Sequence, residues 1–342
     1  MIRFLAWRVL RMAAILFGVA LITFLLMHAI PGTPWNNYSG APRVFSNLGA
    51  DEATLREVNR RFGLDLPLWR QFIRYVVGDI DEESGFFCGV VCGNLGPSIM
   101  QRGLEVEDIL FEPPRGGSFW ESRFGYSIRL VLFAAAITVG LGVPLGIVSA
   151  VRPKSKTSRA ISVALAALIS IPNFVLGLLA IILLASWLRI IQVLPDWEMP
   201  SNWIVPAVVL AVMPMASLAR VTQAAFMNIL GEDYVRAARA KGLTQRRVML
   251  VHVARNALVP IITYLGPALI EMFAGLFVVE SLYAFPGVGR EYWQSVLKLD
   301  YPVILGITLI YATGMLLINM LGEGLCAALD PRIRSIRKPG AP

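Results

Sequence analysis

Residues 231–247 read GEDYVRAARAKGLTQRR, a short charged segment between two long apolar stretches. The alanines favour helix, Asp233 can cap a helix start, and Gly242 stands where a helix end favours a left-handed residue. The segment predicts a short charged helix outside a bilayer, followed by a second basic helix that re-enters it. An ordinary positively charged loop would show the same charge, but the Ala-Ala-x-x-x-Gly spacing favours a helix that fits a groove on another protein.

The composition around this segment is that of a membrane protein. Of 342 residues, 56% are hydrophobic and 16% are charged, whereas soluble domains have about 25% charged residues. A membrane-spanning helix needs about 20 apolar residues. Six runs of about this length or longer have no Lys or Asp inside: Val9–Ala29, Ile128–Val151, Ile161–Leu188, Trp203–Met227, Leu258–Val279 and Val303–Leu325. We therefore predict an all-α membrane protein with six transmembrane helices.

The first run has a second interpretation, a cleaved signal peptide, because three arginines lie before it or at its start: Arg3, Arg8 and Arg11. It is longer than a typical signal core, and no small-x-small cleavage site follows. We therefore expect a retained helix.

The positions of Lys and Arg predict the orientation. They gather at the N-terminus, at 152–159, at 236–255 and in the tail, and such clusters favour the cytoplasmic side. Both termini are thus expected in the cytoplasm, and the long stretch 31–127 on the opposite side. Most of the net charge of +8 comes from these cytoplasmic ends, so the expected partner is the lipid bilayer and not nucleic acid.

The stretch 31–127 holds two further predicted features. Between Asp51 and Asp79 a small amphipathic helical unit is expected, with Leu55, Val58 and Phe62 on one face and Trp69, Phe72, Ile73 and Val76 on another. It would be a cap over the membrane helices or a docking surface for an external partner. The acidic segment Ile99–Gly117 is interpreted as a solvated surface insertion in preference to a substrate-attracting patch.

Two cysteines, Cys88 and Cys92, lie in the same stretch, where a disulfide and two free thiols are equally expected. Without a nearby His they make half of a zinc shell, so no metal site is predicted. Cys326 is interpreted as a packing residue.

Ionisable residues inside the runs are candidates for function, because burying them in a bilayer is expensive. Glu271, together with the polar Asn173, is predicted to lie at a helix interface or on a pathway. Glu280 and Arg129 are expected to reach the membrane surface. A secondary transporter would place paired carboxylates or broken helices at the midplane, and an enzyme would need a nucleophile with a base or clustered ligands. Neither pattern is present, although a secondary transporter or channel subunit without ATP coupling stays the alternative.

Residues 233–243, DYVRAARAKGL, resemble the "EAA" motif with which permease subunits of ABC importers contact their ATPases, although Arg236 replaces the Glu of the general motif. Further segments resemble the dipeptide, oligopeptide and nickel branch of these permeases. They are HAIPG at 28–32, GLDLPL at 63–68, GNLG at 93–96, SIPNFVLG at 170–177, ESLYAFPGVG at 280–289, DYP at 300–302 and LDPRIR at 329–334. Together they cover nearly the whole chain in order.

The resemblance implies the type I ABC importer permease fold in a prokaryotic plasma membrane. It implies a transmembrane helix at 1–30, an extracytoplasmic helical insertion at 31–127, and a five-helix core at 128–342 with a cytoplasmic coupling loop at 228–256. The expected cargo is peptides or similar small solutes. The expected partners are a second permease subunit, two cytoplasmic ATPase subunits and an external solute-binding protein. The chain has no G-x-x-x-x-G-K-[ST] loop, so ATP and Mg would bind to the ATPases, and no cofactor is expected here.

Site residues carried over from the resemblance fall into two groups. The ATPase contact would be made by residues of the charged segment: Glu232, Asp233, Tyr234, Arg236, Ala237, Ala238, Arg239, Lys241, Gly242, Arg246 and Arg247. Of these, Ala237, Ala238 and Gly242 would fit the groove sterically. A second group would form part of the external rim that faces the binding protein, or a simple tight turn: Phe285, Pro286, Gly287 and Gly289.

Overall fold

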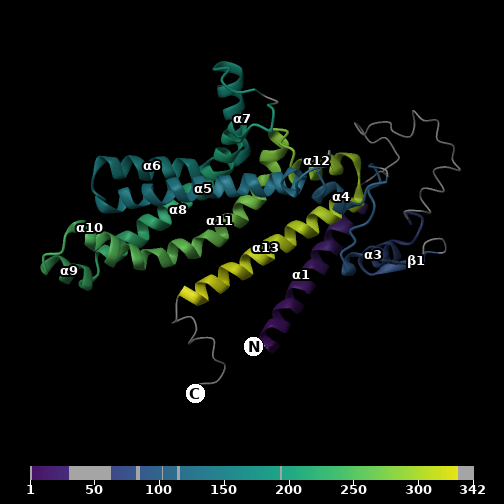
Figure 1. Cartoon of the computed structure of the whole chain (residues 1–342), viewed down its shortest axis with the longest axis horizontal. Helices are drawn as coiled ribbons and strands as arrows, with labels where there is room; N and C mark the ends of the chain where they lie inside the picture. Colours follow the sequence, from purple (N-terminus) through teal and green to yellow (C-terminus); the bar gives the residue numbers. More distant parts are fainter. Residues whose placement is uncertain are drawn as a thin grey trace. The chain divides into compact units, whose positions relative to one another are not determined.

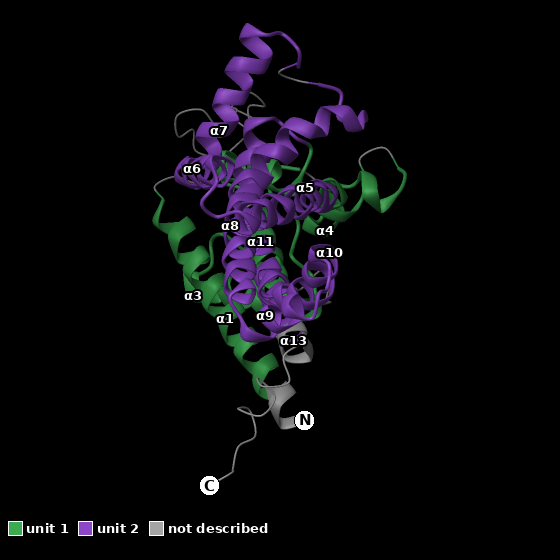
Figure 2. Ribbon diagram, turned by 90° about the vertical axis from the view of Figure 1, so that its left-hand side faces the viewer, with its two compact units in different colours: residues 1–126, 286–314 green, residues 127–285, 315–342 purple. Residues whose placement is uncertain are grey.

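The computed structural model describes residues 2–30, 63–81, 85–101, 103–113, 116–192 and 195–329. Figure 1 traces the chain, and Figure 2 colours its two compact units. Unit 1 holds Met1–Tyr126 and Pro286–Gly314, and unit 2 holds Ser127–Phe285 and Met315–Pro342. Each unit is described below by itself.

Unit 1 is mostly helical and contains one β-hairpin. Its elements are α1 (Ile2–Ala29), α3 (Leu68–Val76), β1 (Gly78–Asp81), β2 (Gly85–Cys88), η2 (Val90–Cys92), α4 (Val106–Phe111), η3 (Phe119–Glu121), α12 (Val288–Lys298) and the first part of α13 (Tyr301–Leu329). The two strands pair antiparallel, with Gly78 opposite Cys88. The predicted all-α class is therefore wrong in this detail, because the Gly-bounded GFFC segment has strand-favouring aromatics and forms β2. Helix α3 confirms the helix in the second half of the predicted unit, but of its predicted apolar face Phe72 is buried while Trp69 and Ile73 are exposed. Leu55, Val58 and Phe62 lie outside the described residues.

The regular elements of unit 2 are all helices in its described part. Its elements are α5 (Arg123–Val151, shared with unit 1 over its first turn), α6 (Lys156–Ser170), α7 (Asn173–Ala180), the π-helical η4 (Ile181–Trp187), η5 (Pro200–Trp203), α8 (Ile204–Leu230), α9 (Asp233–Ala240), α10 (Gln245–Arg247), the π-helical η6 (Val248–Val253), α11 (Ala254–Leu282) and the rest of α13.

Five helical segments are long and apolar enough to cross a membrane: Trp7–Ala29, Arg123–Val151, Pro200–Leu230, Gln245–Leu282 and Tyr301–Gly322. Each contains all or most of one predicted run. The third run, Ile161–Leu188, is different, because the chain bends by 100° between α6 and the helix that begins at Asn173. Pro172 is the cause: a residue before proline disfavours helical geometry, and Ile171 is extended, with φ −97° and ψ 118°. Counted with the bent pair as one span, the described chain has up to six.

The acidic segment 99–117 is not the predicted solvated insertion. Three of its side chains, Val106, Ile109 and Leu110, are fully buried and pack with Leu95 against Val303 and Ile307 of α13. Its acidic residues stabilise helix α4. The Asp108 carboxylate accepts from the Glu105 N–H at 3.0 Å, a capping interaction. The Glu107 carboxylate accepts from the Leu95 N–H at 2.5 Å. The negative charge therefore serves local folding.

Unit 1 also contains a buried polar network around Asp300 and Glu291, called here the Asp300–Glu291 network. Asp300 accepts from the Ser98 hydroxyl at 2.5 Å and from the N–H groups of Ile99 and Met100 at 3.1 and 3.2 Å. Burial raises the pKa of this carboxyl above the ordinary value, and the hydrogen bonds partly oppose that rise.

The Glu291 half of the network fixes the first residue of α5. Glu291 accepts from the Gln101 amide at 2.5 Å and pairs with Arg123 at 3.0 Å. The Arg123 guanidinium also donates to the Ile109 carbonyl at 2.8 Å. Segments far apart in the sequence, 98–123 and 291–300, are thus joined by charged groups.

In unit 2, α5 and α8 approach each other closely through two glycines one helical turn apart. A Cβ on Gly142 would lie 2.9 Å from the Met215 carbonyl oxygen, and one on Gly146 would lie 2.5 Å from the Ala219 carbonyl oxygen. Real Cβ contacts are essentially never closer than 3.0 Å, so this helix contact requires glycine at both positions.

Candidate functional site

The charged segment singled out by the sequence folds as helix α9, and its start differs from the prediction. Glu232 occupies the N-cap position, and Asp233 is the first helical residue. There Asp233 lies near the partial positive charge of the helix N-terminus and pairs with Arg236 at 3.6 Å. Both side chains are exposed, 98% for Asp233 and 72% for Arg236, so the pair has little effect on stability.

The end of α9 confirms the prediction for Gly242. This residue has φ +79°, and its N–H donates to the Arg239 carbonyl at 2.9 Å, while the Leu243 N–H donates to the Ala238 carbonyl at 3.3 Å. These two bonds form a Schellman motif. A Cβ on Gly242 would meet no atom within 4 Å, so backbone conformation, not space within the chain, requires glycine.

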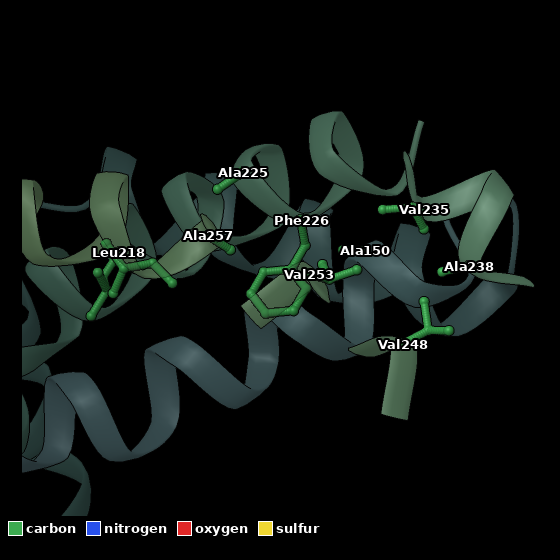
Figure 3. Close-up of a cluster of buried hydrophobic side chains, with 10 residues drawn as sticks. Ala150, Leu218, Ala225, Phe226, Val235, Ala238, Val248, Val253 and Ala257 are labelled. Carbon is green, nitrogen blue, oxygen red and sulfur yellow. The ribbon is translucent and has the colours of Figure 1, made fainter. Parts of the chain in front are cut away.

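The inner face of α9 is fixed to the membrane helices by an apolar cluster (Figure 3). Val235 and Ala238, one turn apart, are buried with Phe226 of α8 and with Val248 and Val253 of η6. Ala238 was expected to fit a groove on an ATPase, but its exposed fraction is 6%. It faces the chain's own core because it shares a helical face with Val235.

The outer face of α9 and the turn after it carry the remaining predicted contact residues. All are exposed: Glu232, Asp233, Tyr234, Arg236, Ala237, Arg239, Lys241, Gly242, Arg246 and Arg247. The Tyr234 hydroxyl accepts from the Asn256 amide at 2.8 Å, which connects α9 to α11. Five of these ten residues are basic and two are acidic. The arrangement is a rigid, mainly positive surface on an apolar support.

Glu271 lies on α11, and Asn173, at the start of α7, packs against α11 one turn away from it. The Glu271 carboxylate, half-buried, lies 3.4 Å from the Tyr264 hydroxyl, which donates to it. Asn173 begins α7, and a Cβ on Gly275, one turn beyond Glu271, would lie 3.1 Å from its amide nitrogen. The Asn173 Oδ1 atom is buried, and no partner for it is found within the described chain. Asn173 is thus at a helix interface, and the structure records no direct contact between it and Glu271.

The predicted external rim is mostly buried. Phe285 has an exposed fraction of 0% and makes edge contacts with Trp197 and Trp203, at ring-centroid distances of 4.9 and 5.1 Å. Gly287 and Gly289 are buried, and Pro286 is partly buried. In this conformation the Phe285 ring anchors the turn internally and cannot itself touch a docked protein.

Cys88 and Cys92 form a disulfide, with their Cα atoms 5.8 Å apart. Among the described residues no group of three or more His, Cys, Asp or Glu could hold a metal ion.

Comparison with known proteins assigns the chain to a family. Residues 142–335 match the family described as "Binding-protein-dependent transport system inner membrane component", and residues 1–111 match its N-terminal counterpart. The chain belongs to this family. The permease is therefore a transport subunit of an ABC importer, from the dipeptide/oligopeptide branch, and is not itself an enzyme.

Relatives and a solved structure resemble the permease over most of its length. It is 34% identical to the dipeptide transport system permease protein DppB of Bacillus subtilis (99% of this chain, 100% of the relative) and 30% identical to DppB of Escherichia coli K12 (98% and 99%). It is 32% identical to the glutathione permease GsiC of Escherichia coli O6:H1 (98% and 99%). A chain of the inward-facing MetNI methionine ABC transporter matches with TM-score 0.50 at 18% identity, covering 60% of the permease and 93% of that chain. The structural match shows the fold alone.

Two charged residues of the permease lie in an environment that the sequence did not predict. Glu280, which was expected to extend to the membrane surface, is fully buried within the chain and accepts from the Ser127 hydroxyl at 2.6 Å. The Arg129 guanidinium stacks over Trp203 at 4.6 Å from the ring centroid, a cation–π contact. Trp203 also touches Phe285, so one tryptophan connects the start of α5 to the 285–289 turn. The contacts among Trp197, Trp203 and Phe285 could not be predicted from the sequence, because these aromatic residues lie far apart and follow no common period.

Proposed function

We propose that this permease forms half of the pathway by which an ATP-driven importer takes up short peptides. Its relatives are named as dipeptide, oligopeptide and glutathione permeases, and all three cargoes are small peptides. Full-length matches at 30% identity or more support a shared cargo class. The cargo is therefore a di- or oligopeptide or a similar small solute.

The proposed topology has six transmembrane segments and both termini in the cytoplasm, in the inner membrane of a prokaryote. The bent pair α6–α7 counts as one segment. Clusters of Lys and Arg at the N-terminus, at 152–159 and around α9 support the orientation. Residues 31–127 would then be the extracytoplasmic insertion, and 128–342 the permease core with its coupling loop at 228–256.

The proposed partners are a second permease subunit, two ATPases that bind ATP and Mg, and an external solute-binding protein. The observation that supports ATPase contact most strongly is the geometry of α9: its Val235–Ala238 face is buried in the chain, while its charged face is exposed. A surface of this kind needs an external partner to use its charges. The exposed coupling residues are those of the outer face, with Ala237 and Gly242 as the small ones.

We further propose that force passes through α9 to the membrane helices. The helix follows α8 after a short turn at 231–232 and packs on η6, which leads into α11. A movement of the ATPases against α9 would therefore displace two membrane helices together, as a hinge-like change between inward-open and outward-open states.

Glu271 is the proposed pathway residue, with Asn173 at the helix interface beside it. A half-buried carboxylate within a membrane segment can stabilise the ammonium group of a passing peptide. Exchange of Glu271 for Gln should lower transport while ATPase binding is unchanged. Loss of the assembled complex in Glu271→Gln would instead assign this residue to the interface.

The coupling proposal is tested on the complex purified with its co-encoded partners and reconstituted in lipid. ATP hydrolysis is measured with and without binding protein loaded with dipeptides. Arg236→Glu reverses charge on the α9 surface and should abolish both ATPase co-purification and the stimulated hydrolysis. Arg152→Glu, an exposed arginine after α5, is the matched control and should retain both.

Two outcomes would contradict the proposal. Equal loss in Arg152→Glu would show a general charge effect rather than a docking surface. Peptide transport by the wild-type complex without ATP would support the carrier alternative.

A further inference from the structure

Helix α3 has two apolar faces, and one of them packs on α1. The Phe72 ring, 8% exposed, lies 5.3 Å from the Phe24 ring and 5.5 Å from the Phe17 ring. The Gln71 side-chain oxygen lies 3.2 Å from the His28 Nε2 atom. These contacts fix α3 against the C-terminal half of a membrane span.

The other apolar face of α3 is uncovered by the described chain. Trp69, Ile73 and Val77 follow one another at helical spacing and have exposed fractions of 65%, 47% and 53%. They form a stripe along the helix, called here the Trp69 stripe. With Leu68, which is 48% exposed, the stripe gives this short helix an apolar exposed side.

The contacts with α1 give the depth of this stripe. Phe24 lies five residues before Ala29, where both α1 and the apolar span end. Phe17 lies twelve residues and His28 one residue before the same end. At 1.5 Å per residue, the α3 contacts with His28, Phe24 and Phe17 therefore lie about 2, 8 and 18 Å below the end of the span, and their mean depth is about 9 Å. Amphipathic helices that lie in a membrane interface are buried by about 5–10 Å.

The apolar surface of α1 continues onto α3. Phe17 is itself 52% exposed, and Leu26 is 64% exposed, as expected for side chains in contact with acyl chains. Because the Phe17 ring touches Phe72, the exposed apolar surface of α1 adjoins the helix that carries the Trp69 stripe. An apolar stripe beside a membrane span favours lipid as its occupant.

The charges of α3 fit the same environment. At about 100° per residue, Arg70 and Arg74 follow the Trp69 stripe around the helix. Arginines beside an apolar stripe can extend to the headgroups while their stems cover apolar surface, and Trp is enriched at the membrane–water boundary. Arg70 is half exposed and pairs with Asp79 at 3.9 Å.

We propose that α3 lies in the outer leaflet of the bilayer as an interfacial helix, with Trp69, Ile73 and Val77 in contact with acyl chains and with its arginines at the headgroup level. The helix then anchors the start of the 63–123 region to the membrane and is not a docking site for the binding protein. The assignment to the outer leaflet rests on the proposed orientation; the lipid contact does not.

The experiment measures the collision of a nitroxide with oxygen, which concentrates in lipid, and with the water-soluble complex NiEDDA. The full complex is reconstituted in nanodiscs, in a Cys326→Ser background that keeps the Cys88–Cys92 disulfide. Labels are placed at Ile73→Cys and Val77→Cys on the stripe. Leu26→Cys is the lipid control, and Ser118→Cys, an exposed residue, is the aqueous control. Basal ATP hydrolysis verifies that each variant is assembled.

Labels on the stripe should show an oxygen-to-NiEDDA ratio close to that of Leu26→Cys and several-fold above that of Ser118→Cys. The ratio should not change when binding protein is added. A ratio equal to that of Ser118→Cys would place α3 in water and overturn the proposal. Low collision with both reagents, or a fall in both on addition of binding protein, would show that a protein surface covers the stripe, and would equally overturn it.

Discussion

Charged residues of the permease have opposite environments in the Asp300–Glu291 network and on the outer face of α9. Asp300 and Glu291 are almost fully buried, and each accepts hydrogen bonds from named groups within unit 1. Asp233 and Arg236 are largely exposed, and theirs is the one ion pair recorded on α9 in the described chain. Buried charges that are fully hydrogen-bonded hold a chain together, whereas exposed charges on a rigid support are available to a partner. Position in the structure, not residue type, separates the two roles.

The largest predicted effect comes from the buried side of this comparison. Asp300→Ala removes the acceptor of three hydrogen bonds and leaves buried donors unsatisfied, which should cost about 3 kcal/mol of stability. Thermal unfolding of the purified complex measures it. Asp300→Asn keeps an acceptor oxygen of similar shape and should lose clearly less. Equal loss in both variants would mean that charge, not hydrogen bonding, is what the network needs.

Two neighbouring alanines of α9 give the sharpest contrast. Ala238→Leu adds volume to the packed cluster with Val235 and Val248 and should destabilise the local fold by about 1–3 kcal/mol. Ala237→Leu lies on the exposed face and should leave stability unchanged while it weakens ATPase co-purification. Thermal unfolding and co-purification are measured on both. A stable Ala238→Leu variant would contradict the buried position of Ala238.

A smaller effect is expected at the end of α9. Gly242→Ala must adopt a left-handed conformation at a cost of about 1 kcal/mol, so the Schellman turn should weaken and stimulated ATP hydrolysis should fall. Asn accepts this conformation more readily, and Gly242→Asn should restore part of the activity. If Gly242→Asn is as impaired as Gly242→Ala, the partner requires that position 242 carry no side chain, and the left-handed backbone is not the deciding factor.

The stability of the complex should also depend on pH through the titration of Asp300. Because its pKa in the folded chain is raised, its contribution to stability is complete below the ordinary pKa of an aspartate and is lost as the pH rises through the raised pKa. The wild-type complex should therefore lose more stability than Asp300→Asn as the pH rises through this window. Parallel pH profiles for the two proteins would exclude Asp300 as the titrating group.

The smallest effect is expected on the exposed side. Asp233→Ala removes an exposed pair and should leave the unfolding temperature unchanged. Its effect should appear as an altered salt dependence of ATPase co-purification, because exposed charges are screened. A marked drop in unfolding temperature would show that Asp233 supports the fold after all.

The long helices could be predicted from the sequence because their signal is local. About 20 apolar residues in a row have few alternatives, and five of the six runs lie in such helices. The bend at Pro172 was visible in principle, since proline restricts the residue before it. Its size could not be predicted, because tertiary packing sets the angle.

Predictions failed where burial depends on segments far apart in the sequence. Val106, Ile109 and Leu110 have helical spacing, yet the acidic residues among them hid the signal, and their partners Val303 and Ile307 lie some 200 residues later. Ala238 was predicted to contact a partner because the residues that bury it come from α8 and η6 and are not evident from its local sequence. The position of the charged helix α9 followed from charge and spacing, but which of its sides faces inward needed the structure.

The glycine contact between α5 and α8 limits the motions that the permease can make. At Gly142 and Gly146 the two backbones nearly touch, and the Met215 and Ala219 carbonyls leave no room for one helix to slide along the other. Sliding would place a residue with a side chain where Gly142 or Gly146 now faces a carbonyl oxygen of α8. We therefore expect α5 and α8 to move as one rigid unit. If the ATPases push on α9 as proposed, α5 should move together with α8, although α5 and α9 are some 80 residues apart in the sequence.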